Sequence, residues 1–266
     1  MSVAAIGGCS AASDAPAGTA AGGPAVVATT SWQGAFAKAA GATDITVIAP
    51  SSSQHAAEYD PTPSDLTAVK NAGFVLYSDF ESFAPQVTES AAADATTIEV
   101  NADNAPQNIV DEVARLGRTF GTEEASQKWI AQFEAAVAEI ETQIREALGD
   151  RGDPPIVSQM YVTWLANMVS ADVTTFGPSP LTAGDVLELA QRNPLLVLDN
   201  AHMSAGTVLP DSSAVQIQVA NYPGDDLDLI GVFRSDAALV IGALSGQPIT
   251  QAQVPGAHSS SGSHGH

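Results

Sequence analysis

The stretch Thr122–Leu148 reads TEEASQKWIAQFEAAVAEIETQIREAL, and it decides how the chain is organised. Its large apolar residues recur every three or four positions, which is the spacing of one face of an α-helix. At about 1.5 Å per residue this helix would be about 40 Å long, enough to run the length of a small domain. The glycines and prolines of 149–155 (GDRGDPP) end it. The apolar face consists of Trp129, Phe133, Val137, Ile140, Ile144 and Leu148.

On both sides of this helix, short apolar and β-branched runs alternate with helical patterns. Before it, we expect strands at 25–30, 44–49 and 74–77, and helices at 32–40, from Pro63 onward and at 104–120. Ser64 is a candidate cap for the helix that starts at Pro63. After the long helix, we expect strands at 156–160, 195–198 and 214–219, and helices at 161–169, 180–191 and 235–244.

Strands separated by helices predict parallel sheets. The expected fold class is therefore α/β, with two α/β lobes of mainly parallel sheet joined by one long linker helix. Small ligands tend to bind in the cleft that such an arrangement leaves between the lobes. The expected segments are a signal remnant and flexible tether at 1–24, an N-terminal lobe at 25–121, the linker helix at 122–150, a C-terminal lobe at 151–250 and a disordered His-bearing tail at 251–266.

The net charge of the chain limits the classes of partner that we expect. Nine Lys and Arg against thirty Asp and Glu give a net charge of −21, whereas phosphate neutralisation needs a basic face. A nucleic-acid partner is therefore not expected. No Gly-x-Ser-x-Gly elbow, Walker loop, Cys-x-x-Cys or His-Glu-x-x-His motif is present, so we expect a binding protein rather than an enzyme. We expect a monomer that binds a small solute or metal ion.

The residues before Cys9, Ala5-Ile6-Gly7-Gly8, resemble the lipobox of bacterial lipoproteins. This resemblance implies that Cys9 becomes lipidated and that the protein is extracytoplasmic and anchored to the cell membrane. The charged start of a signal peptide does not precede Cys9, so the true start is expected upstream, or the sequence was trimmed. No apolar run reaches the roughly 18 residues that span a bilayer.

Three segments resemble the zinc- and manganese-receptor family of ABC importers. They are VVATTSWQGAF at 26–36, HAAEYDPTPSDLTAVKNAGFVLY at 55–77 and FGPSP at 176–180. The resemblance implies a solute-binding subunit with a periplasmic binding protein fold, an ABC permease as membrane partner, and zinc or manganese as the transported ligand. In that family the metal lies between the lobes and is held by four side chains, mostly histidines and carboxylates.

The chain departs from the family at the metal site. Ala57 replaces the first histidine, and His55 is the nearest substitute. His202 follows an expected strand, so it could form a rearranged site with Asp199 and His55. Amides and hydroxyls are weak ligands for zinc, so the resemblance supports the scaffold better than the metal. The candidate metal ligands are His55, Glu99, Gln159, His202 and Asn221.

Other residues are candidates for lining the cleft around an organic solute. Trp32 and Trp164 follow expected strands at equivalent lobe edges, and core packing is the alternative role for both. In the resemblance, Thr97 is the closest match to the family's second histidine, and Glu58 lies beside Tyr59, where it could supply a carboxylate oxygen. The alternatives to metal uptake are therefore the same scaffold with an organic or chelated ligand, or a surface adhesion lipoprotein.

Overall fold

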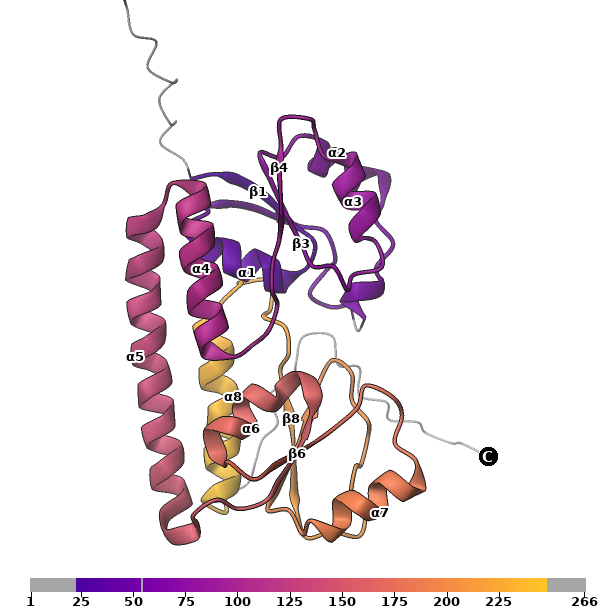
Figure 1. Ribbon diagram of the computed structural model, residues 1–266, viewed down its shortest axis with the longest axis vertical. Coiled ribbons are helices and arrows are strands. Elements are labelled where there is room, and N and C mark those ends of the chain that lie inside the picture. The colour runs from indigo at the N-terminus through magenta and orange to yellow at the C-terminus, as the bar shows by residue number, and fades with distance from the viewer. Residues whose placement is uncertain (1–22, 54, 248–266) are drawn as a thin grey trace, which may run out of the picture.

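The computed structural model describes residues 23–53 and 55–247, and it contains two four-stranded parallel sheets (Figure 1). The first sheet has the order β2-β1-β3-β4 and the second has the order β6-β5-β7-β8, so both sheets follow one topology. The strands of the first sheet are β1 (Ala25–Ala28), β2 (Asp44–Val47), β3 (Phe74–Tyr77) and β4 (Thr96–Glu99). Those of the second are β5 (Ile156–Gln159), β6 (Val173–Phe176), β7 (Leu196–Asn200) and β8 (Val215–Val219).

The helices divide between the two sheets. We call β1–β4 with α1–α4 the first lobe, and β5–β8 with α6–α8 the second lobe. The first lobe contains α1 (Ser31–Ala39), α2 (Pro63–Lys70), α3 (Ala84–Ser90), α4 (Pro106–Phe120) and a 3-10 turn at Ala56–Glu58. The second lobe contains α6 (Thr163–Val169), α7 (Ala183–Gln191), α8 (Leu229–Leu244) and a 3-10 turn at Met160–Val162. The linker helix α5 (Glu123–Leu148) is followed by a 3-10 turn at Gly149–Arg151.

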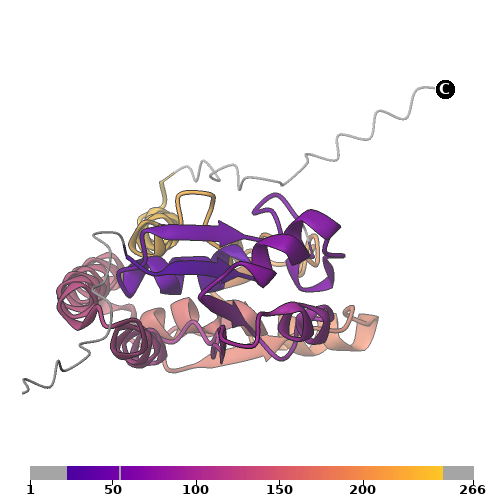
Figure 2. The same cartoon turned by 90° about the horizontal axis from the view of Figure 1, so that it is seen from above.

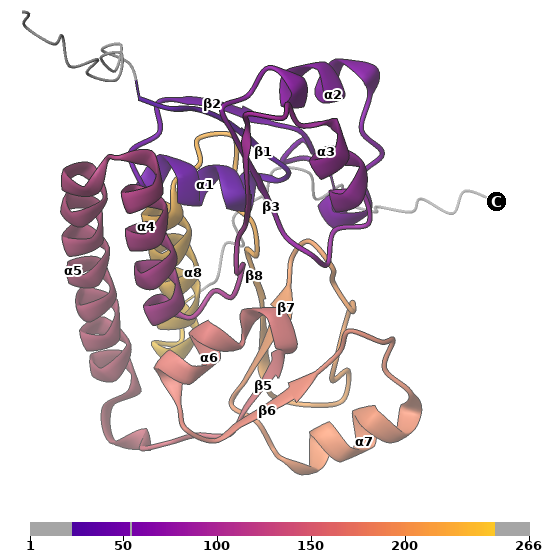
Figure 3. The same ribbon diagram turned by 45° about the horizontal axis from the view of Figure 1, so that its top comes forward.

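The linker helix runs along one side of both lobes, with α4 and α8 beside it (Figures 1 and 3). Viewed from above, these three helices lie together at one end while the strands extend away from them (Figure 2). The expected rod between two sheet-and-helix lobes is confirmed.

Aromatic side chains join the linker to the second lobe. Phe133 of α5 stacks on Trp129 at 5.1 Å between ring centroids and meets Phe233 of α8 edge-on at 5.0 Å. The ring of Trp164 lies 4.0 Å from that of Phe233. These rings belong to one hydrophobic core that also contains residues of the first lobe, such as Phe36 and Leu116. Because interiors are close-packed, this shared core favours small adjustments of the lobes over a wide swing.

Local chemistry explains where several elements begin, and it corrects some expectations. The cap of α2 is Thr62 rather than Ser64, because Thr62 and Asp65 exchange side-chain to backbone hydrogen bonds in a capping box. Helix α8 begins at Leu229, earlier than the expected 235, because the carboxylate of Asp228 accepts from the N–H of Gly231. Three elements were not expected at all, namely α3, β4 and β6.

Within the described residues, no helix combines the length and the apolar character needed to cross a membrane. Cys9 and the histidines of the C-terminal tail lie outside the described residues. The expected segment boundaries stay predictions.

Candidate functional site

A cleft of about 1080 Å³ lies between the two lobes, and residues of both lobes line it. Its walls come from the ends of the strands. Phe80 follows β3, Glu99 ends β4, Met160 follows β5 and Tyr222 follows β8. In open parallel sheets, ligands bind outside the carboxyl ends of the strands. Here the carboxyl ends of two sheets meet at one cavity, so this cleft is the candidate binding site.

The first-lobe wall carries the charge of the cleft. Its acidic residues are Glu58, Asp79, Glu99 and Asp103. Asp103 uses its carboxylate to accept from the N–H of Ala105 at the start of α4, at 2.8 Å. Within the described part of the chain, no side-chain hydrogen bond or ion pair engages the other three carboxylates. These three residues therefore line the cleft without a hydrogen-bonded or ion-paired partner for their carboxylates among the described residues.

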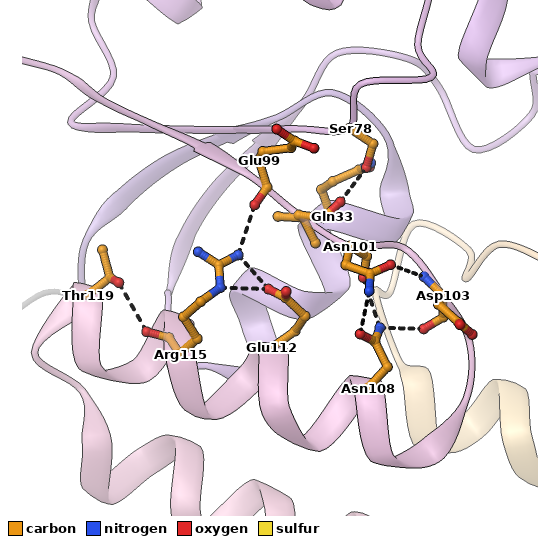
Figure 4. A network of polar contacts seen from close by, with 10 residues as sticks. Gln33, Ser78, Glu99, Asn101, Asp103, Asn108, Glu112, Arg115 and Thr119 are labelled. Carbon is orange, nitrogen blue, oxygen red and sulfur yellow. Dashed lines mark hydrogen bonds and ion pairs between the residues drawn. The ribbon is translucent and has the colours of Figure 1, made fainter.

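Figure 4 shows the polar contacts of Arg115, whose guanidinium binds the backbone of Glu99. Arg115 of α4 donates from Nη2 to the backbone carbonyl of Glu99 at 2.8 Å and pairs with the carboxylate of Glu112. Nearby, Asn108 donates to the carbonyls of Asn101 and Asp103 and fixes the loop that leads into α4. The guanidinium of Arg115 is thus already paired with Glu112, and it holds the backbone of the first-lobe wall at Glu99.

The second-lobe wall is apolar and aromatic. It contains Met160, Tyr161, Trp164, Met203 and Tyr222, together with the uncharged polar groups of Thr163, Asn167, Thr175 and Asn221. Burial raises the pKa of Tyr222 to about 12, so its phenol stays neutral at pH 7. Among the described residues that line the cleft, this wall contributes no Asp, Glu, Lys, Arg or His.

A buried polar network supports the floor of the cleft beneath Gln33. Glu81 accepts hydrogen bonds from the hydroxyl of Thr29 at 2.9 Å, from Nε2 of Gln33 at 2.9 Å and from the N–H of Ser78 at 3.0 Å. Burial raises the pKa of Glu81 to about 7, although these hydrogen bonds oppose the rise. Gln33 borders the cleft but is fully buried, so the network fixes the structure beneath the cleft wall.

Polar contacts also cross between the lobes. At the cleft, Nδ2 of Asn104 donates to Oδ1 of Asn221 at 2.9 Å. Farther out, the hydroxyl of Ser51 donates to the carboxylate of Asp225 at 2.6 Å, and Lys38 donates to the carbonyl of Asp226. The acidic run after Tyr222 therefore contacts the first lobe and leads into the capping residue of α8.

The candidate metal ligands do not all lie on the cleft. Glu99 and Asn221 line it, whereas His55, Gln159 and His202 are not among its lining residues. His55 is exposed before the 3-10 turn at 56–58. The buried side chain of Gln159 accepts from the N–H of Tyr161 at 2.7 Å. Their roles as ligands stay predictions.

His202 lies one layer behind the cleft wall. Its Nδ1 accepts from the N–H of Asn221 at 3.3 Å, and its ring meets Tyr222 edge-on at 5.1 Å. Burial lowers its pKa to about 4, so the ring is neutral at pH 7. Over residues 23–53 and 55–247, no three side chains of the His, Cys, Asp and Glu types gather to hold a metal ion. The structure therefore does not bring His55, Asp199 and His202 together, and their role as a rearranged site stays a prediction.

Most of the residues expected to line the cleft around an organic solute are found there. Trp32, Glu58 and Trp164 line the cleft, whereas Thr97 does not. Both tryptophans are also buried, so each serves the core and the wall. Sequence reasoning missed Phe80, Met160, Tyr161, Met203 and Tyr222, which line the cleft as well. Their position just after a strand was the available signal, because strand ends face the cleft.

The comparisons with known proteins agree with this architecture. Residues 26–115, within the first lobe, match the family model described as the periplasmic zinc-uptake complex component A. This match confirms the resemblance to metal receptors for that segment. No curated protein sequence matches the chain.

Solved structures with the same fold include three bacterial proteins of low sequence identity. The Ni²⁺ complex of FpvC from P. aeruginosa has a TM-score of 0.64 at 11% identity, over 84% of this chain and 95% of that chain. The laminin-binding protein Lmb of Streptococcus agalactiae has a TM-score of 0.62 at 14% identity, over 84% and 99%. The Zn(II)-bound ZnuA-like domain of AdcA from Streptococcus pneumoniae has a TM-score of 0.60 at 12% identity, over 84% and 100%. At these identities the likeness shows the fold.

Proposed function

We propose that this chain is the extracytoplasmic solute-binding subunit of an ABC importer that serves transition-metal uptake. The observation that carries the proposal is the interlobe cleft, which is built from the carboxyl ends of two parallel sheets with one topology. The match of residues 26–115 to a zinc-uptake component supports the metal, as do the Zn(II) and Ni²⁺ of the solved structures with this fold.

In this proposal the solute bridges the lobes, and the loaded form docks on a membrane permease. The hydrophobic core shared by both lobes and α5 limits the lobes to small adjustments, so loading would change the rim of the cleft more than the overall shape. Lipidation of Cys9 would hold the protein at the membrane. Cys9→Ser is expected to release it into the soluble fraction, and continued membrane retention would contradict that anchor.

Uptake can be tested in cells that carry or lack the gene. Under metal limitation, deletion is expected to lower cellular zinc or manganese, measured by mass spectrometry of digested cells. Asn167 is exposed and lines the cleft, so Asn167→Trp should obstruct part of the cleft and restore less of the metal content than the parent gene. Leu187→Trp is the matched control on α7, at an exposed position outside the cleft. Unchanged metal content after deletion would contradict the proposal.

Whether the solute is a bare metal ion or a larger organic molecule is a separate question, because different observations support each alternative. The family match favours a bare ion, for which His55→Ala should abolish zinc or manganese binding in isothermal titration. The size and aromatic lining of the cleft favour an organic molecule or a metal chelate instead. A bare ion needs a few close ligands, whereas a cavity of about 1080 Å³ suits a much larger solute.

A further inference from the structure

The two walls of the cleft differ in chemistry, and this difference bears on which solute fits. All four acidic residues that line the cleft belong to the first lobe: Glu58, Asp79, Glu99 and Asp103. No lysine, arginine or histidine is found among the lining residues in the described chain. An anionic solute would meet uncompensated carboxylates here, whereas a cation would be attracted by them.

The opposite wall presents exposed apolar surface. Large apolar side chains that remain accessible include Met160 at 43%, Tyr161 at 40% and Met203 at 36%, all on the second-lobe wall. Phe80 of the first lobe is 56% exposed and also lines the cleft. Apolar surface gathered at one cavity usually marks a binding site, and methionines adapt to ligands of irregular shape.

The two tryptophans of the cleft carry a second, independent indication. Trp32 is 3% exposed and Trp164 is 7% exposed. Neither indole Nε1–H has a hydrogen-bond partner within the described residues. A buried donor without an acceptor is unfavourable, so a solute that supplies an acceptor after a small shift of the ring would be favoured.

We propose that the cleft binds a positively charged organic solute with an aromatic or apolar body, its charge against the first-lobe carboxylates and its body against the second-lobe aromatic wall. A cationic metal chelate and a metal-free organic cation share this chemistry. The inference rests on the proposed function, because it takes the interlobe cleft as the site of the cargo.

Isothermal titration with defined probes tests charge and body separately. Tetraphenylphosphonium and tetraphenylborate have nearly the same shape and opposite charges, so the cleft should bind the first and reject the second. Tris(1,10-phenanthroline)nickel(II) represents a cationic chelate, nickel–EDTA an anionic chelate and nickel chloride the bare ion. Binding of the phenanthroline complex alone would identify the chelate as the source, and binding of the phosphonium alone would identify a metal-free cation.

The net charge of −21 attracts any cation, so matched variants are needed. At about 0.15 M salt the screening length is about 8 Å, which suppresses attraction by distant charges. Glu58→Gln with Asp79→Asn should weaken binding of the cationic probe about tenfold, as expected for removing close charges. Glu134→Gln with Glu141→Gln removes the same charge from the exposed face of α5 and should leave binding unchanged.

A second pair of variants tests the contribution of the apolar second-lobe wall to binding. Tyr161→Ala removes an exposed ring from the wall and should also weaken binding about tenfold or more, in the range of one lost aromatic contact. Leu187→Ala removes exposed apolar surface outside the cleft and should have no effect. Both positions are accessible, so neither change should prevent folding.

Several outcomes would overturn the inference. The inference fails if tetraphenylborate or nickel–EDTA binds as tightly as its cationic counterpart, if the α5 pair weakens binding as much as the cleft pair, or if no organic cation binds at all. Binding of bare nickel that the cleft variants weaken, without binding of the organic cations, would also overturn it but leave the proposed uptake function intact. That function fails only if deletion leaves cellular metal unchanged, so the two failures are distinguishable.

Discussion

Replacing Asp236 by asparagine should change how the stability of the protein depends on pH. Asp236 lies on α8 and is 2% exposed, and its Oδ1 accepts from the N–H of Ala220 at 3.0 Å. Ala220 immediately precedes Asn221 and Tyr222, which line the cleft. The side chain therefore holds the exit of β8 where the second-lobe wall begins. Asparagine keeps an oxygen for this bond and cannot ionise.

The magnitude follows from the proton that the folded chain retains. Burial raises the pKa of Asp236 from 3.8 to about 8. In the unfolded chain this carboxyl loses its proton near pH 4, so between pH 4 and 8 only the folded state holds it. Stability contributed by this group is therefore lost as the pH rises, by about 1.4 kcal/mol per unit. Between pH 5 and 7 the loss is about 3 kcal/mol, and Asp236→Asn should remove it.

The measurement is the free energy of unfolding by urea at several pH values between 5 and 8, for both proteins. Other groups with altered pKa values, including Glu81 and His202, contribute equally to both proteins and cancel in the difference. The asparagine protein should gain about 1.4 kcal/mol per pH unit relative to the parent, on top of any constant offset. Glu134→Gln, an exposed change on α5, should show no such trend. A difference that does not vary with pH would refute the reasoning.

Three further changes test the packing, each by urea unfolding at fixed pH. Phe133→Ala removes a fully buried ring between Trp129 and Phe233 and should cost about 3–5 kcal/mol, so a loss below 1 kcal/mol would contradict the shared core. Thr62→Ala should cost about 1 kcal/mol because it removes the capping box of α2, whereas Ser64→Ala should cost little, and the reverse order would contradict the cap. Gly117→Ala should lower the free energy of unfolding by about 1–3 kcal/mol, although alanine favours helices, because the Cβ of the new alanine would lie 2.2 Å from Oγ of Ser126. A gain in stability would show that α4 and α5 do not approach so closely.

Much of the architecture was accessible from periodicity. The apolar face that ends at Leu148 predicted the linker helix with its start only one residue from the observed one. A long amphipathic pattern of this kind fits few structures other than a helix. The run at 74–77 gave β3 with its bounds, since a short β-branched and aromatic segment between turns is typical of a buried strand. The two-lobed fold followed from the alternation on both sides of the linker.

The elements that were missed lack such patterns. Strand β4 has three exposed positions of four, and it pairs with β3 at the edge of the sheet. Strand β6 is also at an edge, and its threonines are not strongly apolar. Such strands are specified by pairing with a neighbour more than by their own composition, so tertiary context decides them.

Only some of the residues that line the cleft could be predicted, because the cleft also depends on how the strands pair. Trp32 and Trp164 were recognisable because each follows a buried strand, but Met160 and Met203 look unremarkable in the sequence. Their common wall exists only once β5 and β7 lie side by side, as their parallel pairing shows. The family pattern also drew attention to His55 and His202, which the structure places outside the lining of the cleft. A motif gives position along the chain, whereas the cleft depends on position in space.

The most direct test of the central claim is a crystal structure of the protein purified without denaturation from the cells that produce it, with its cargo retained. The cargo should lie between the lobes, in contact with Glu58 of the first lobe and Tyr161 or Trp164 of the second. Anomalous scattering at the absorption edges of zinc, manganese and nickel would show whether the cargo contains a metal. A cargo bound outside this cleft, or touching only one lobe, would contradict the account.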